Sequence, residues 1–208
     1  EDHRAAGLDR IVVDADGVYR KTGPARVFCR ETDAVAAVKG HGARPIQPGD
    51  VLVLMGRGPL GSGMEEIYQI TSALRHLSWG REVAVVTDAR FSGVSTGACI
   101  GLVAPEALAG GPIGKLRDGD RIRIVIDRNT LEGSVDLVGD ISGEFTPEEA
   151  ARILAERPPH PGLSPDPQLP DETRLWAALQ QASGGTWGGC VFDVDRIITQ
   201  LKINRPQT

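Results

Sequence analysis

Residues 82–93 read EVAVVTDARFSG, and this stretch decides the fold class. A run dominated by valine and alanine passes directly into a polar segment with aspartate, arginine, serine and glycine. Residues 51–55 (VLVLM) repeat the arrangement, because they run into the glycine-rich segment 56–63. A short apolar run next to turn-forming residues is typical of a buried strand. Since α/β proteins place functional groups on the loops that follow such strands, both loops are candidate sites.

Shorter elements are predicted around these two strands. Residues 34–39 form a helix after Thr32 and Asp33, and a longer helix is predicted over Met64 to Leu77, where apolar residues recur every three or four positions. The two strands themselves are predicted over 51–55 and 82–86. Further strands are predicted over 10–14, 25–28, 98–103 (strand or short helix), 121–126 and 131–137, with turns at 14–17 and 21–24. The expected architecture is α/β, a closed or half-closed mixed β-barrel flanked by helices.

After Gly139 the predicted structure becomes helical. Thr146-Pro147-Glu148-Glu149 is a helix start, with threonine as N-cap, proline in the first turn and glutamate three residues on. A proline-rich connector (158–170), a helix (171–182), a glycine-rich segment (184–189) and a last helix (194–201) follow. We therefore expect a barrel domain over 1–139 and, over 140–208, a helical C-terminal extension packed on the same domain.

Composition narrows the function classes. The 208 residues suit one large domain, and the net charge of −5 comes from acids and bases mixed along the chain. Without a basic stripe, nucleic acid is not an expected partner. No apolar run reaches the roughly 18 residues that a membrane span requires, and no signal peptide opens the chain, so a cytoplasmic protein is expected. Cys29, Cys99 and Cys190 lie far apart and are predicted to be free thiols.

The glycine-rich segment 56–63 leaves two interpretations open. Backbone N–H groups at the start of a helix favour an anion. Glu65 and Glu66, however, would lie in the first turn of the predicted helix and suit a hard cation such as Mg²⁺ better. The alternative is that the two acids only complement the helix dipole.

The second loop, residues 87–96, contains Asp88, Arg90 and Ser92. Gly93 and Gly97 would let the backbone approach a ligand closely. A serine is a weak base or nucleophile unless its surroundings activate it, and the scattered histidines give no support to a Ser-His-Asp hydrolase. The alternative is that Asp88 and Ser92 only satisfy backbone groups of the loop.

Several ordered segments resemble one family, the dihydroxy-acid and 6-phosphogluconate dehydratases. The resemblance runs from about residue 22 to 137, and the tail segments 175–176 and 184–190 are most similar to the D-xylonate dehydratase branch. The segments that carry it are 22–28, 48–51, 58–61, 63–64, 87–93, 105–107, 110–113 and 117–122. The resemblance implies a C-terminal domain with a swivelling β/β/α-type barrel.

It also implies the chemistry. Family members convert a 2,3-dihydroxy acid to a 2-keto-3-deoxy acid with an iron–sulfur cluster, of the 2Fe–2S or 4Fe–4S type, and Mg²⁺. By the resemblance, Ser92 is the base that removes the C2 proton, and Glu66, with Glu65 as the fallback, is the Mg²⁺ ligand. The remaining positions of the second loop, Asp88, Arg90, Ser95 and Thr96, are implied to bind substrate. No cluster ligand is expected in this chain, since a separate N-terminal domain would hold the cluster.

The sequence therefore predicts the C-terminal half of a hydro-lyase acting on a sugar acid such as a pentonate. Its partners would be the N-terminal cluster domain, the sugar acid and, at full length, further copies of the enzyme. This half alone should be inactive, because it carries only part of a shared site. The alternatives are a non-catalytic, stand-alone swivelling domain that binds an acid or a protein, and a phosphosugar-binding domain with 56–63 as phosphate cradle. Glu65 and Glu66 disfavour the phosphate cradle by repulsion.

Overall fold

A seven-stranded mixed sheet organises the computed structural model, which describes residues 13–42 and 44–201. The strand order is β6-β4-β2-β1-β7-β8-β9. The central strand β1 pairs in parallel with β2 and antiparallel with β7, so it joins a parallel half to an antiparallel half. The strands are β1 (Val18–Phe28), β2 (Val51–Leu54), β4 (Ala84–Thr87), β6 (Ala98–Ile100), β7 (Arg121–Asp127), β8 (Glu132–Asp140) and β9 (Gly143–Glu144).

The sheet is open among the described residues. Its edge strands β6 and β9 have three and two residues, and they pair with β4 and β8 but not with each other. Edges this short leave few unpaired backbone groups, so no closure is needed to protect them. The α/β class, the mixed sheet and the flanking helices are thus confirmed, whereas the predicted closure into a barrel is not observed.

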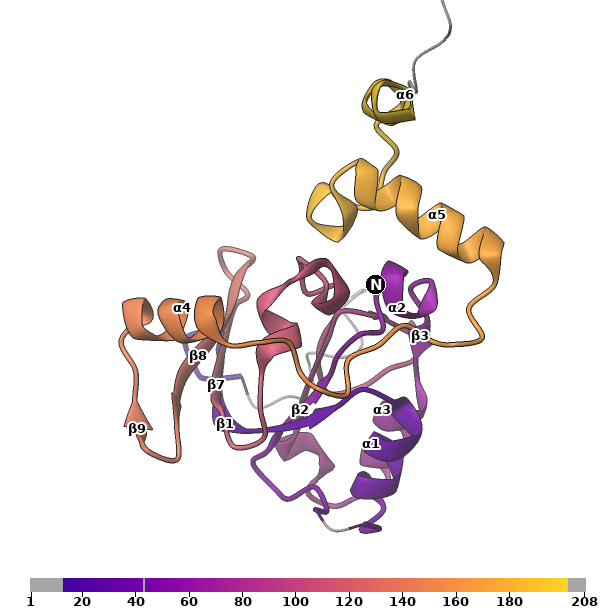
Figure 1. Cartoon of the computed structure of the whole chain (residues 1–208). Helices are drawn as coiled ribbons and strands as arrows, with labels where there is room; N and C mark the ends of the chain where they lie inside the picture. The colour runs from indigo at the N-terminus through magenta and orange to yellow at the C-terminus, as the bar shows by residue number, and fades with distance from the viewer. Residues whose placement is uncertain (1–12, 43, 202–208) are drawn as a thin grey trace, which may run out of the picture.

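Two hydrophobic clusters cover the two faces of the sheet. Leu52, Leu54 and Val85 face the cluster that contains α1 (Glu31–Val38) and α3 (Gln69–Arg75). The alternate residues, among them Val51 and Val53, belong to the other cluster, into which α4 (Pro147–Glu156) also packs. Figure 1 shows α1 and α3 together on one side and α4 beside β7 and β8. Burial on both faces explains why β2 and residues 84–86 of β4 are apolar without interruption.

The turn predicted at residues 21–24 is wrong, because these residues lie inside β1. The N–H of Ala25 donates to the carbonyl of Asp120 (2.7 Å) on the β7 side. Successive N–H groups of a strand point to opposite sides, so position 24 faces β2, and pairing with β2 begins only at Ala25. Pro24 therefore removes no hydrogen bond from the ladder, and a proline at this junction is compatible with a strand.

The long helix predicted from Met64 to Leu77 is also wrong in its first turn. Met64 has a left-handed backbone (φ 62°), Glu66 and Ile67 form strand β3 (Glu66–Ile67), and the helix α3 begins only at Gln69. The apolar periodicity arises because Ile67, although it lies in a strand, is buried in the same cluster as the α3 side chains. Glu65 and Glu66 therefore do not lie in a first helical turn.

Other local predictions are confirmed or fall outside the described residues. The helix predicted over 34–39 is α1, which begins three residues earlier, and the 121–137 hairpin is the antiparallel pair β7–β8. The turn at 14–17 forms, with the Gly17 N–H donating to the Asp14 carbonyl (2.9 Å). The strand predicted over 10–14 lies mostly among the undescribed residues 1–12.

The helical tail follows the sequence prediction closely. Thr146 forms the expected capping box of α4, and α5 (Asp171–Ala182) and α6 (Val194–Leu201) have the predicted bounds. The proline-rich connector crosses in front of the sheet to reach α5 (Figure 1). It is tied to the glycine-rich loop by the Asp166 N–H, which donates to the Gly61 carbonyl (2.8 Å). The tail thereby lies over one of the two candidate loops.

Candidate active site

A second, two-stranded parallel sheet joins the two candidate loops. Glu66 of β3 pairs with Arg90 of β5 (Arg90–Phe91), and Ile67 pairs with Phe91. The Ser92 N–H donates to the Ile67 carbonyl (3.1 Å) and continues the ladder. Ile67 and Phe91 pack into the core, whereas Glu66 and Arg90 are exposed. Since side chains alternate along a strand, position 92 belongs to the same side as Arg90 and Glu66.

The two candidate metal ligands differ in how their carboxylates are used. Both oxygens of Glu65 accept hydrogen bonds from Arg57, at 2.6 Å and 2.5 Å, and the Arg57 side chain is only 13% exposed. Glu66 instead forms an ion pair with Arg90 through Oε2 alone, at the exposed surface. Arg90 also donates from Nε to the Met64 carbonyl (3.2 Å). Glu66 is therefore the more exposed of the two side chains, at 41% against 29%, and it keeps Oε1 outside the ion pair.

The buried carboxylate of Asp88 anchors the glycine-rich loop through hydrogen bonds to its backbone. This side chain is fully buried and accepts three backbone N–H bonds, from Gly56 (3.0 Å), Arg57 (2.9 Å) and Ala107 (2.9 Å). Burial raises the pKa of Asp88, while the three N–H donors oppose that rise. Asp88 thus connects the loop after β2 with the segment that begins η3 (Ala107–Ala109).

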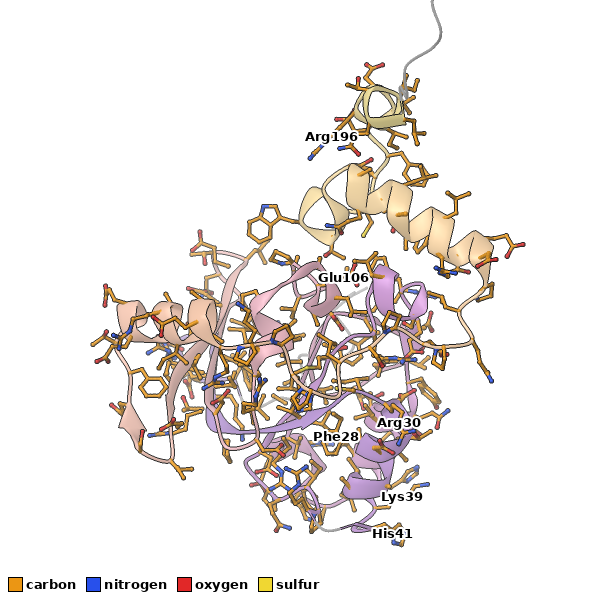
Figure 2. The ribbon with its side chains drawn as sticks, viewed as in Figure 1. Phe28, Arg30, Lys39, His41, Glu106 and Arg196 are labelled. Atoms are coloured by element: carbon orange, nitrogen blue, oxygen red, sulfur yellow. The ribbon has the colours of Figure 1, made fainter. Side chains whose placement is uncertain are left out.

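Glu106 is a second buried carboxylate under the same loop. Its side chain is 1% exposed, and Oε2 accepts from the Leu60 N–H (3.1 Å) at the start of α2 (Pro59–Ser62). Burial raises the pKa of Glu106 to about 7. A Cβ at position 58 would lie 2.3 Å from Oε2, so Gly58 is required for this approach. Figure 2 shows Glu106 beside α2, on the side of α5.

These contacts argue against the phosphate cradle. The N–H groups of residues 56, 57 and 60–64 all donate to protein acceptors, which are Asp88, Glu106 and carbonyls of the loop itself. A phosphate would have to displace bonds that organise the loop. Together with the two glutamates nearby, this removes the basis for a phosphosugar site here.

The other polar residues of the second loop lie in different surroundings. Ser92 is half-buried, and its Oγ is 3.5 Å from the Val94 N–H, a weak contact. The Ser95 hydroxyl is bonded to Thr71 (3.2 Å) and to a backbone carbonyl. Thr96 lines a separate hollow of about 260 Å³ beside the end of α3. Ser92 therefore lies on the same side of the β3–β5 pair as Arg90 and Glu66, whereas Thr96 lines a different hollow.

Two features of the site were missed by sequence reasoning. Glu106 lies in segment 105–107, which carries part of the dehydratase resemblance, but a lone acid in a loop gives no signal of burial. The β3–β5 pairing was missed because two-residue strands have no periodicity to detect.

Potential metal ligands do not cluster in the described residues. Within residues 13–42 and 44–201, no three His, Cys, Asp or Glu side chains form a group that could hold a metal ion. The three cysteines are free, as predicted, and each is half-buried. Among the helices that the structure describes, none is long and apolar enough to cross a membrane.

Comparison with known proteins identifies the class of domain. Residues 8–157 match the family described as dihydroxy-acid/6-phosphogluconate dehydratase, C-terminal. The chain is 58% identical over 202 residues to the D-xylonate dehydratase YagF of Escherichia coli, covering 97% of this chain and 30% of that protein. It is 54% identical over 201 residues to D-xylonate dehydratase YjhG of the same organism, covering 96% and 30%.

A less similar relative matches a shorter part of the chain. The chain is 49% identical over 161 residues to dihydroxy-acid dehydratase 2 of Bordetella bronchiseptica, covering 77% of this chain and 24% of that protein. The chain belongs to the dihydroxy-acid/6-phosphogluconate dehydratase family, of which it forms the C-terminal domain. The expected resemblance is confirmed, including the similarity of the tail to D-xylonate dehydratases, and the chain spans about 30% of the length of those two relatives.

Proposed function

We propose that this chain is the C-terminal half of a hydro-lyase that dehydrates a 2,3-dihydroxy sugar acid such as a pentonate. Loss of the C2 proton and the C3 hydroxyl as water leaves an enol, which tautomerises to the 2-keto-3-deoxy acid. The supporting observation is the pairing of Glu66 with Arg90, because it unites the two loops that sequence reasoning had singled out. The names of the relatives support the reaction class.

In this proposal Ser92 is the base that removes the C2 proton. A serine oxygen needs nearby positive charge to act as a strong base. Arg90 lies two residues away in the same strand pair and would face the acid group of the substrate. Ser95 and Thr96 are retained as proposed substrate contacts. Asp88 is proposed to act through the loop that it holds, since its carboxylate is fully buried.

The family implies Mg²⁺ and an iron–sulfur cluster, and the residues here fit a shared Mg²⁺ site. Glu66 fits because its carboxylate is exposed and Oε1 lies outside the ion pair, whereas Arg57 engages both oxygens of Glu65. Mg²⁺ in enzymes is commonly held by one or two protein carboxylates, with substrate oxygens and water completing the shell. When bound, the ion and the cluster would supply Lewis-acid stabilisation of the negative charge that develops on the acid.

The rest of the proposed enzyme would lie outside this chain. An N-terminal domain of the same protein would hold the cluster, and none of the three cysteines here is assigned to it. In this view residues 1–139 are a swivelling catalytic domain and 140–208 an extension packed on it, in a cytoplasmic enzyme that forms homo-oligomers. The isolated chain would be inactive because it carries part of a shared site.

The test is the Ser92→Ala variant of the full-length enzyme, assayed with a pentonate for 2-keto acid. We expect kcat to fall at least about 10³-fold, within the range for loss of a general base, with iron and magnesium contents unchanged. Ser142→Ala, which changes an exposed serine in the turn after β8, is the control and should keep full activity. Retained turnover in Ser92→Ala would overturn the role of Ser92. No turnover by the wild-type enzyme on any dihydroxy acid would favour a non-catalytic binding domain.

A further inference from the structure

A groove lies between the helical tail and the sheet-bearing body of the domain, beside the candidate active site. Its volume is about 490 Å³, within the roughly 300–1,000 Å³ typical of small-molecule sites. The sheet-bearing body of the domain forms one wall, and α5 with η5 (Gly185–Gly188) and the residues after it forms the other. Gly63, Met64, Arg90 and Leu102 line it on the body side, and Gln180 and Cys190 line it on the tail side.

The groove is continuous with the proposed catalytic face. Arg90 lines the groove, forms the ion pair with Glu66 and donates to the Met64 carbonyl. Gly63 contacts the tail directly, since a Cβ at this position would lie 2.3 Å from Cγ2 of Thr173. A substrate whose acid end meets Arg90 and Ser92 could therefore extend its other end between the tail and Met64.

Gln180 supplies an unused hydrogen-bond acceptor in the tail wall. The residue is only 3% exposed, and its Nε2 donates to the Cys190 carbonyl (3.0 Å), which fixes the orientation of the amide. Its Oε1 is buried and has no hydrogen-bond partner among the described residues. Leaving such an acceptor unsatisfied costs about 1–3 kcal/mol, so the position favours a donor that arrives with a ligand.

Backbone strain is concentrated at the same groove. Four non-glycine residues in the described chain have positive φ, and three of them, Met64 (62°), Leu102 (55°) and Cys190 (56°), line the groove. The left-handed conformation costs a non-glycine residue about 1–2 kcal/mol. Strained residues tend to cluster at ligand-binding and catalytic sites, where the surrounding structure holds them in place.

The family match stops before the tail wall. It ends at residue 157, whereas α5 begins at Asp171. The alignments with the two D-xylonate dehydratases cover 202 and 201 of the 208 residues, so they extend through most of the tail. A wall present in relatives named for a sugar acid suggests a contact with the sugar.

We propose that this groove receives the polyhydroxylated end of the acid, with Gln180 Oε1 accepting a hydrogen bond from a hydroxyl beyond C3. The inference rests on the proposed function and makes Gln180 a specificity-determining residue. Because Oε1 is shielded in the free chain, the tail wall must shift slightly when the hydroxyl enters. The glycines at 184, 185, 188 and 189 give the wall segment after α5 more backbone freedom than other residues would.

The experiment compares full-length enzymes on a five-carbon aldonate and on its 4-deoxy and 5-deoxy analogues. Gln180→Leu should lower kcat/KM for the aldonate about 10- to 100-fold while leaving it nearly unchanged for one of the two analogues. Gln180→Glu keeps an acceptor oxygen but loses the donor to Cys190, so it should still discriminate between the aldonate and that analogue. Gln181→Leu, on the exposed side of α5, is the matched control and should behave as wild type.

The outcomes separate this inference from the proposed function. Equal losses on all three acids in both Gln180 variants would mean that Gln180 only braces Cys190, and the inference would be overturned. Wild-type kinetics in Gln180→Leu would overturn it too, with the dehydratase function intact. If the wild-type enzyme turns over none of these acids, the proposed function and the inference are both rejected.

Discussion

The buried carboxylate of Glu106 makes the stability of this domain depend on pH. Burial raises its pKa from the ordinary 4.5 to about 7 in the folded chain. Between these two values the folded state retains a proton that the unfolded state has released. The free energy of unfolding therefore falls as the pH rises through this window, by about 1.4 kcal/mol per pH unit and about 3 kcal/mol in all. Above pH 7 the loss is complete, and below pH 4.5 it is absent.

The perturbation that isolates this effect is Glu106→Gln. The amide keeps the shape and an acceptor for the Leu60 N–H, but it cannot ionise. We expect the variant to match the wild type near pH 5 and to become more stable by about 2–3 kcal/mol at pH 8. The assay is urea unfolding of both chains at pH 5, 6, 7 and 8, from which the difference in unfolding free energy is plotted against pH.

Taking the difference at each pH cancels the titration of every other group. Glu132→Gln, which removes an exposed carboxylate at the start of β8, controls for the change in net charge. A difference that stays within about 0.5 kcal/mol across the range would refute the reasoning. A wild type that gains on the variant as pH rises would show that Glu106 is stabilised as an anion, against its burial.

Two further predictions concern the metal ligand and the tail. Glu66→Gln in the full-length enzyme should weaken Mg²⁺ binding at least about 10-fold, as measured by calorimetry. Glu65→Gln should leave Mg²⁺ binding unchanged. It should instead lower thermal stability, because Arg57 loses its partner in a half-buried site. The reverse pattern would transfer the ligand role to Glu65. Thr146→Ala should lower the free energy of unfolding in urea by about 1 kcal/mol, since the Thr146 hydroxyl accepts a hydrogen bond from the Glu149 N–H (3.2 Å). An unchanged urea midpoint would mean that α4 does not need its cap.

Local signals in the sequence were sufficient for most elements. The valine-rich runs of β2 and β4 are apolar on both faces because helices or loops cover both, and that requirement is visible in each run by itself. The capping box of α4 and the bounds of α5 and α6 depend on residues within one helical turn of each other. The dehydratase resemblance likewise came from short ordered motifs.

The local predictions that were wrong concern segments whose structure depends on residues distant in the sequence. Residues 21–24 contain turn residues, yet they form a strand because β1 changes partner at that point. Met64 to Ile67 carries a helical period, yet Glu66 and Ile67 pair with a strand 24 residues away. In both places the energy of tertiary pairing exceeds a local preference of a few tenths of a kcal/mol to about 1 kcal/mol per residue.

The sequence by itself determined the α/β class, the helical tail, the family and the two loops on which a site could lie. Only the tertiary structure decided that Arg57 engages both carboxylate oxygens of Glu65 while Glu66 keeps Oε1 outside its ion pair. It also decided that Asp88 and Glu106 anchor the glycine-rich loop through its backbone N–H groups. It also placed Gln180 of the tail in a groove beside Arg90. The physical reason is that burial and hydrogen-bond partners are properties of the packed chain, which no single segment encodes.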